Sequence, residues 1–191
     1  TCWAADDKAY LPALPDTPGH LPLDTANADG TIVAPFCSLA DSPLLARVFN
    51  SYDRETTDFY RWTQVYELRE LSALVREKSG VDIGELTALE PLAKGASGRI
   101  FRLRVVGTKN SFIVGKELEI RRILSPSHLR SSAFDAEFTS DGRVILRGLG
   151  WGHGVGLCQI GAAVMADRGY GYRAILEHYY PDTQISESLS K

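Results

Sequence analysis

The residues best suited to chemistry lie in one short stretch near the C-terminus. His153 stands between Gly152 and Gly154, and Gly156 follows shortly after. Glycine lets the backbone adopt positive φ angles and leaves little side-chain bulk around its neighbour. An imidazole titrates near neutral pH and can donate or accept hydrogen bonds. We therefore expect His153 to be presented at a surface cleft; the alternative is a structural histidine that only holds the loop.

The residues after these glycines predict a helix that ends near Gly169. Its apolar positions recur at helical spacing and are Leu157, Ile160, Ala163, Val164 and Ala166. The first N–H groups of a helix have no partner within it, and the helix dipole adds partial positive charge there. The loop and helix start are therefore expected to seat an anionic or strongly polar group, with Gln159 close by.

Composition limits the classes of function. The chain has 191 residues, of which 44% are hydrophobic, enough for one well-filled core or two small lobes. Its 21 basic and 24 acidic residues give a net charge of −3 without a basic tract, which argues against nucleic acid or an acidic membrane as partner. No apolar run of about 18 residues predicts a membrane span. The start at Thr1 without a leader predicts a processed chain or a fragment.

The pattern predicts an α+β fold, with a largely antiparallel sheet and helices packed on it. We expect one domain portion over residues 1–191. Its four parts are an irregular extended segment at 1–41, a helix-strand-helix at 42–80, a strand-rich region at 85–150, and a loop with two helices at 151–183. A predicted hairpin in the third part runs into the Gly-His-Gly loop, which leads into a buried C-terminal helix.

The first segment carries two of the three cysteines. Cys2 and Cys37 could pair across a loop, as in an oxidising compartment, but free thiols are equally compatible. Three cysteines, with Cys158 as the third, are too few for a disulfide framework. Trp3 and the pair Tyr10-Leu11 are the expected anchors of this segment on the surface beneath it.

The stretch from Gly152 to Thr183 resembles the C-terminal signature of the SpoIID/LytB family, which comprises stage II sporulation protein D and the amidase-enhancer proteins. The matching residues are Gly152-His153-Gly154-Val155-Gly156, Gln159, Gly161-Ala162, Met165-Ala166, Gly169-Tyr170, Tyr172, Ile175-Leu176, His178-Tyr179-Tyr180-Pro181 and Thr183. Leu157 and Cys158 stand where the family pattern has Met and Ser. A weaker resemblance extends upstream and includes Ser97-Gly98-Arg99.

The resemblance implies a lytic transglycosylase that cuts peptidoglycan glycan strands in the bacterial cell envelope, in a periplasmic or extracellular location. Such cleavage needs a buried carboxylic acid with a raised pKa. In the family this glutamate belongs to an N-terminal half. Glu90-Pro91 has the family's dipeptide but not its context, so no catalytic acid is assigned. Two explanations stay open: the C-terminal part of a longer enzyme, or a non-catalytic module that binds glycan or enhances a partner cell-wall amidase.

The remaining site residues follow from the resemblance. His153, Gln159 and the N–H groups after Gly156 are expected to bind sugar hydroxyls or an N-acetyl carbonyl, with Gly152 and Gly154 shaping the loop. Tyr179 could offer a face for a sugar ring or belong to the core.

Three further assignments are weaker. Arg121 could bind a peptide-stem carboxylate, but a structural pair with Glu117 is favoured. A nucleophilic Cys158 activated by His153 is disfavoured, because the family pattern has Ser at this position. A zinc site formed by His153, Cys158 and His178 is also disfavoured, because no paired zinc-ligand motif occurs. We expect no metal and no cofactor.

Overall fold

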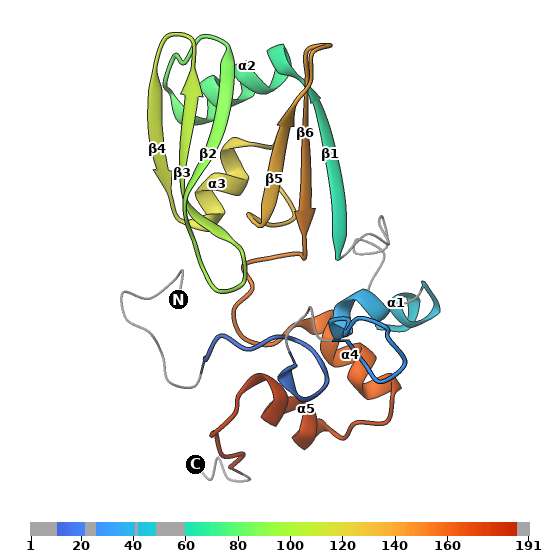
Figure 1. Cartoon of the computed structure of the whole chain (residues 1–191). Helices are drawn as coiled ribbons and strands as arrows, with labels where there is room; N and C mark the ends of the chain where they lie inside the picture. The colour runs from blue at the N-terminus through green and yellow to red at the C-terminus, as the bar shows by residue number, and fades with distance from the viewer. Residues whose placement is uncertain (1–10, 22–25, 41, 49–59, 187–191) are drawn as a thin grey trace. The chain divides into compact units, whose positions relative to one another are not determined.

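The computed structural model in Figure 1 divides into two compact units. The sheet unit is Tyr60–Gly154, and the helical unit is formed by the described residues of Trp3–Phe59 and Val155–Lys191. The structure describes residues 11–21, 26–40, 42–48 and 60–186. The expectation of a single domain stays a prediction, because two units can be parts of one domain.

The sheet unit contains two antiparallel sheets of three strands each. One sheet has the order β1-β6-β5, with bounds Arg61–Glu67, Arg143–Leu149 and Phe134–Phe138. The other has the order β2-β3-β4, with bounds Leu86–Lys94, Ile100–Gly107 and Ser111–Gly115. The strands alternate buried and exposed residues, since one face of each sheet packs on the core and the other meets water.

Two helices pack against these sheets and contribute to the core. α2 spans Leu68–Ser79 and ends at Gly80, which has a φ of 74° and so supplies the left-handed cap. α3 spans Glu117–Ile123 and lies beside the second sheet in Figure 1. The core draws on both sheets and both helices, with Trp62, Leu71, Leu103, Ile120 and Leu146 among its buried members.

The end of the β1–β6 pair fixes where the glycine-rich loop begins. Trp62 pairs with Gly148, and a side chain at Gly148 would overlap the indole ring. The indole Nε1 donates a hydrogen bond to the Gly150 carbonyl over 3.1 Å. A buried tryptophan therefore anchors the first residue of the loop.

The helical unit is built from α1 at Ser42–Val48, α4 at Gln159–Asp167 and α5 at Tyr172–Tyr179. Two short 3-10 turns, Pro18–His20 and Phe36–Leu39, join it from the N-terminal segment. α4 is its centre: it contacts α1, α5 and the second turn, and Val164 and Met165 pack with Phe36 and Leu44.

The predicted α+β class and antiparallel pairing are confirmed. Two details differ from the expectation. The strands form two sheets instead of the single sheet expected, since β2, β3 and β4 pair with one another and not with β1, β5 or β6. The described part of segment 1–41 also enters a core, since Phe36 is only 1% exposed.

Some expectations concern residues beyond this description. The anchors Trp3 and Tyr10 and the Cys2 partner of a Cys2–Cys37 disulfide lie outside the described residues. None of the helices in the described part of the chain combines the length and apolar character that crossing a membrane requires.

Candidate functional site

The glycine-rich loop holds its shape through alternate residues in the left-handed region. Gly150, Gly152, Gly154 and Gly156 have φ angles of 70°, 80°, 69° and 72°. Residues with a Cβ are strained there, so the spacing of the glycines is dictated by the backbone. His153 is exposed on this loop and is not enclosed in the core, and the cleft expected beside it stays a prediction.

Arg99, in the connection between β2 and β3, contacts the glycine-rich loop. Its Nε donates a hydrogen bond to the Gly152 carbonyl over 2.9 Å. A Cβ at Gly154 would overlap the guanidinium group, so the second glycine makes room for this arginine. The Gly152 N–H also donates to the Arg130 carbonyl over 2.7 Å. Hydrogen bonds within the sheet unit therefore hold Gly152, the residue before His153, in place.

Sequence reasoning did not assign a role to Arg99. The only signal was its place in Ser97-Gly98-Arg99, within the weaker upstream resemblance. Its contact with Gly152 joins residues 53 positions apart, which spacing along the chain does not reveal.

Within the helical unit, α4 begins with a side-chain cap. Cys158 is the N-cap residue, and its Sγ accepts a hydrogen bond from the Gly161 N–H over 3.4 Å. The Tyr180 hydroxyl accepts one from the Leu157 N–H over 3.2 Å. Two of the N–H groups around the helix start are thus already used. Gln159 is the first residue of α4 and is exposed.

Three residues of the C-terminal signature, Gly161, His178 and Tyr179, lie around the carboxylate of Asp16. Tyr179 Oη donates to Asp16 Oδ1 over 2.8 Å, and His178 Nε2 lies 3.1 Å from the same oxygen. A Cβ on Gly161 would lie 2.5 Å from Asp16 Oδ2 and would overlap the Tyr179 hydroxyl. The glycine at position 161 therefore lets the N-terminal segment approach α4 closely.

Burial sets the protonation of the groups that hold Asp16. It lowers the pKa of His178 and raises the pKa of Tyr179 above its usual range, so both side chains are neutral at pH 7. A carboxylate can only accept hydrogen bonds, which places the proton of the imidazole on Nε2. The hydroxyl of Tyr179 is engaged with Asp16, which favours the structural interpretation of this residue.

Cys37 and Cys158 carry free thiols that face each other. The hydrogen bond between them raises the pKa of Cys37 and lowers that of Cys158, with Cys37 as the donor. The Gly161 N–H also favours the thiolate of Cys158. The two sulfur atoms and a carboxylate oxygen of Asp16 all lie within 4.8 Å of one another.

Arg121 forms the structural pair that the sequence favoured. Its Nη1 lies 3.4 Å from Glu117 Oε2, and its Nε donates to the Leu129 carbonyl over 2.7 Å. The two side chains are 12% and 4% exposed. Glu90, by contrast, is exposed on β2 and lies 3.4 Å from Arg104 Nη1, so it lacks the burial of a glycan-cleaving acid.

The expected site residues fall in both units. His153, Gly152, Gly154 and Arg121 belong to the sheet unit, and the other three to the helical unit. The structure brings Gly152 and Gly154 to Arg99, and Tyr179 to Asp16. Gly156 meets the Tyr180 hydroxyl.

Comparison with known proteins agrees with the resemblance of the signature. The chain is 31% identical over 150 residues to stage II sporulation protein D of Bacillus amyloliquefaciens, covering 78% of this chain and 39% of that protein. It is 29% identical over 146 residues to the protein of that name in Bacillus subtilis (strain 168), covering 76% and 39%. The amidase enhancer of Bacillus subtilis (strain 168) is 44% identical over 41 residues, 22% of this chain and 6% of that protein.

These relationships confirm the predicted similarity to stage II sporulation protein D and the amidase enhancer. The chain spans about two fifths of the length of the sporulation proteins, at 39% of each. A family model described as a domain of unknown function, DUF8618, matches residues 1–156. The chain therefore belongs to the DUF8618 family.

Proposed function

We propose that this chain is the glycan-binding, C-terminal part of a peptidoglycan lytic transglycosylase of the bacterial cell envelope. The observation that carries the proposal is the exposed His153 on a loop held by Arg99 and shaped by left-handed glycines. The similarity to stage II sporulation protein D supports the cell-wall context.

The loop suits a saccharide because its shape exists before binding. Arg99 and Arg130 already hold Gly152 by hydrogen bonds to both sides of its peptide backbone. Binding therefore costs little conformational entropy for ordering the loop, which favours affinity for a polar ligand. The imidazole of His153 can bond to a sugar hydroxyl or to the carbonyl of an N-acetyl group.

Glycan cleavage also needs an acid. In the proposed reaction a carboxylic acid protonates the glycosidic oxygen, and the bond between this oxygen and the anomeric carbon breaks. The 6-hydroxyl of the sugar that holds the anomeric carbon then closes on that carbon and gives its proton to the carboxylate, which yields an anhydro product. Glu117 is buried but paired with Arg121, and Glu90 is exposed. We therefore assign the acid to the part of a longer protein that corresponds to the remaining length of the relatives, and glycan binding to this chain.

The test compares this chain with the longer protein that contains it. Each is incubated with purified peptidoglycan, the products are examined by mass spectrometry for anhydro-muropeptides, and bound protein is measured by sedimentation with the glycan. We expect both to bind and only the longer protein to release anhydro products. Release by neither protein would refute the transglycosylase assignment, and no binding by this chain would refute its glycan-binding role.

A second function has its own observation. The 41-residue match to the amidase enhancer, at 44% identity, suggests a module that stimulates a cell-wall amidase. Adding this chain to an amidase acting on peptidoglycan would then increase the rate of release of peptide stems. Glycan binding without anhydro products from the longer protein, together with such stimulation, would favour this second function.

A further inference from the structure

A cluster of metal-binding side chains lies in the helical unit, apart from the glycine-rich loop. Asp16 comes from the N-terminal segment, Cys37 from the 3-10 turn Phe36–Leu39, and Cys158 from the residue that caps α4. One donor atom of each lies within 4.8 Å of both others. Three separate parts of the chain thus bring two thiols and one carboxylate to a single point.

The two oxygens of the Asp16 carboxylate differ in their hydrogen bonds. Its Oδ1 is held by Tyr179 and His178, whereas its Oδ2 is buried and has no hydrogen-bond partner among the residues that the structure describes. A buried carboxylate oxygen without a partner is costly, so such an atom calls for an explanation. Carboxylates that bind metals are commonly fixed by hydrogen bonds to their other oxygen, which is the arrangement of His178 and Tyr179 around Asp16.

The spacing also fits a tetrahedral ion. Zinc lies about 2.3 Å from thiolate sulfur and about 2.0–2.2 Å from carboxylate oxygen. A tetrahedral angle then separates two ligand sulfurs by about 3.8 Å and a sulfur from an oxygen by about 3.5 Å. The measured upper limit of 4.8 Å allows these separations after small side-chain adjustments.

We propose that Asp16, Cys37 and Cys158 form a binding site for one thiolate-preferring divalent metal ion, of which Zn²⁺ is the best match. Two sulfur ligands and one oxygen ligand suit zinc better than magnesium or calcium, which prefer all-oxygen sites. Three protein ligands leave the fourth position to water or an external ligand. The site differs from the disfavoured His153-Cys158-His178 combination, with which it shares only Cys158.

Such an ion would join the N-terminal segment to the start of α4. Asp16 and Cys37 lie more than a hundred residues before Cys158 in the sequence, so one bound ion would close a long loop of chain. Because the ligands are not assembled in an unfolded chain, binding of the ion stabilises the folded helical unit.

The test begins with the whole chain, purified with reductant and without chelator. Elemental analysis should find about one Zn²⁺ per chain after dialysis. Co²⁺ replacing it should give a thiolate-to-cobalt absorption band, and a chelator should lower the melting temperature. The variants Cys37→Ser, Cys158→Ser and Asp16→Asn should each lose the stoichiometric metal.

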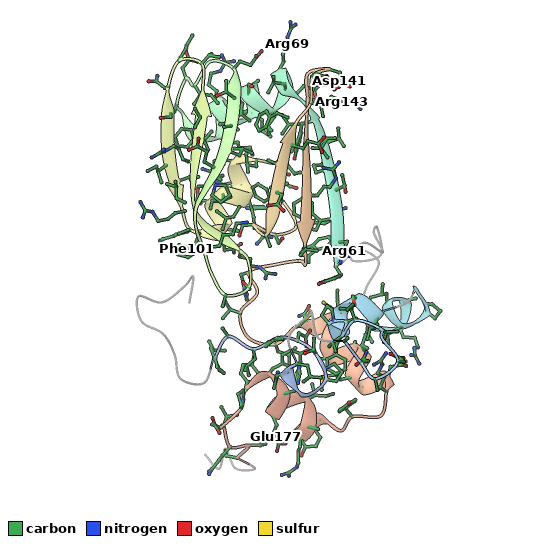
Figure 2. The ribbon with its side chains drawn as sticks, in the orientation of Figure 1. Arg61, Arg69, Phe101, Asp141, Arg143 and Glu177 are labelled. Carbon is green, nitrogen blue, oxygen red and sulfur yellow. The ribbon has the colours of Figure 1, made fainter. Side chains whose placement is uncertain are left out.

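Two control variants separate the site from non-specific binding. Glu177→Gln removes an exposed carboxylate of α5, labelled in Figure 2, and Cys2→Ser removes the remaining thiol. Both should retain the metal and the cobalt band. His178→Gln should weaken binding about 10- to 100-fold, because it replaces one of the two groups that hold Asp16 Oδ1 without removing a metal ligand.

Several results would overturn the proposal. One is wild-type protein that neither retains Zn²⁺ nor gives the cobalt band. Another is a Cys37–Cys158 or Cys2–Cys37 disulfide found by peptide mapping of protein purified without reductant. If Asp16→Asn bound the metal as tightly as Glu177→Gln does, Asp16 would not be a ligand. If Cys2→Ser lost the metal, the proposed set of ligands would be wrong.

Discussion

Gly161→Ala is the sharpest test of how the N-terminal segment meets α4. A Cβ at this position would overlap the Tyr179 hydroxyl and lie 2.5 Å from Asp16 Oδ2. The tyrosine and the carboxylate would have to separate, which breaks the 2.8 Å hydrogen bond between them. The substitution therefore tests one contact that joins residues 16, 161 and 179.

The expected cost follows from three contributions. Overpacking costs about 1–3 kcal/mol, and loss of a hydrogen bond to a charged group costs about 1.5–3 kcal/mol. Alanine in a helix regains about 0.5–1 kcal/mol relative to glycine. The net destabilisation is about 1.5–5.5 kcal/mol, which lowers the melting temperature by roughly 3–22 °C for a chain of this size.

The assay is thermal unfolding followed by circular dichroism, with two comparison variants. Gly171→Ala adds a methyl group where nothing lies within 4 Å and should cost no more than about 1 kcal/mol, as expected at an N-cap. Tyr179→Phe, combined with Gly161→Ala, removes the overlapping hydroxyl and should make the two changes less than additive. A Gly161→Ala protein as stable as the wild type would refute the described contact.

Three other substitutions test the sheet unit. Arg99→Ala should weaken peptidoglycan binding in sedimentation assays while costing about 1.5–3 kcal/mol in unfolding, because the Gly152 carbonyl loses a charged donor; unchanged binding would contradict the role of Arg99. Glu117→Gln should cost about 3–5 kcal/mol, since it leaves a buried arginine unpaired; chemical denaturation measures this, and a neutral effect would count against the pair. Asp141 has its pKa lowered by hydrogen bonds from Arg143 and Thr139, both at the β5–β6 turn where Figure 2 labels Asp141 and Arg143. Because the folded state disfavours protonation of Asp141, the ionised carboxylate stabilises the fold above its unfolded pKa, and this stabilisation is lost as the pH falls below that pKa. Asp141→Asn should therefore flatten the dependence of the unfolding free energy on pH below about pH 4, and an unaltered acid profile would contradict this.

The local structure could be predicted because its causes are local. Leu68, Leu71 and Val75 recur at helical spacing before Gly80, and α2 ends there with a left-handed cap. The alternation of charged and apolar residues in β3 and the turn between β5 and β6 could also be predicted from the sequence. The positive φ angles of the glycine-rich loop follow from the residue type itself.

The tertiary contacts could not be predicted, because they join residues far apart in the chain. Asp16 lies in a proline-rich segment with no periodicity, yet it holds His178 and Tyr179. Its carboxylate gives a physical reason for Gly161, which the sequence showed only as part of a resemblance. The meeting of Cys37 with Cys158 was similarly hidden, because single cysteines carry no information about partners.

The central claim is that His153 contacts peptidoglycan from a loop that is already in place. The direct measurement is the affinity of this chain for purified peptidoglycan, compared between wild type and His153→Ala, with the melting temperature of both proteins recorded alongside. Because the ring is exposed, we predict at least about 10-fold weaker binding, the equivalent of roughly 1.4 kcal/mol, with a nearly unchanged melting temperature. Equal binding by the two proteins, or a loss of binding that only follows a loss of stability, would contradict the account.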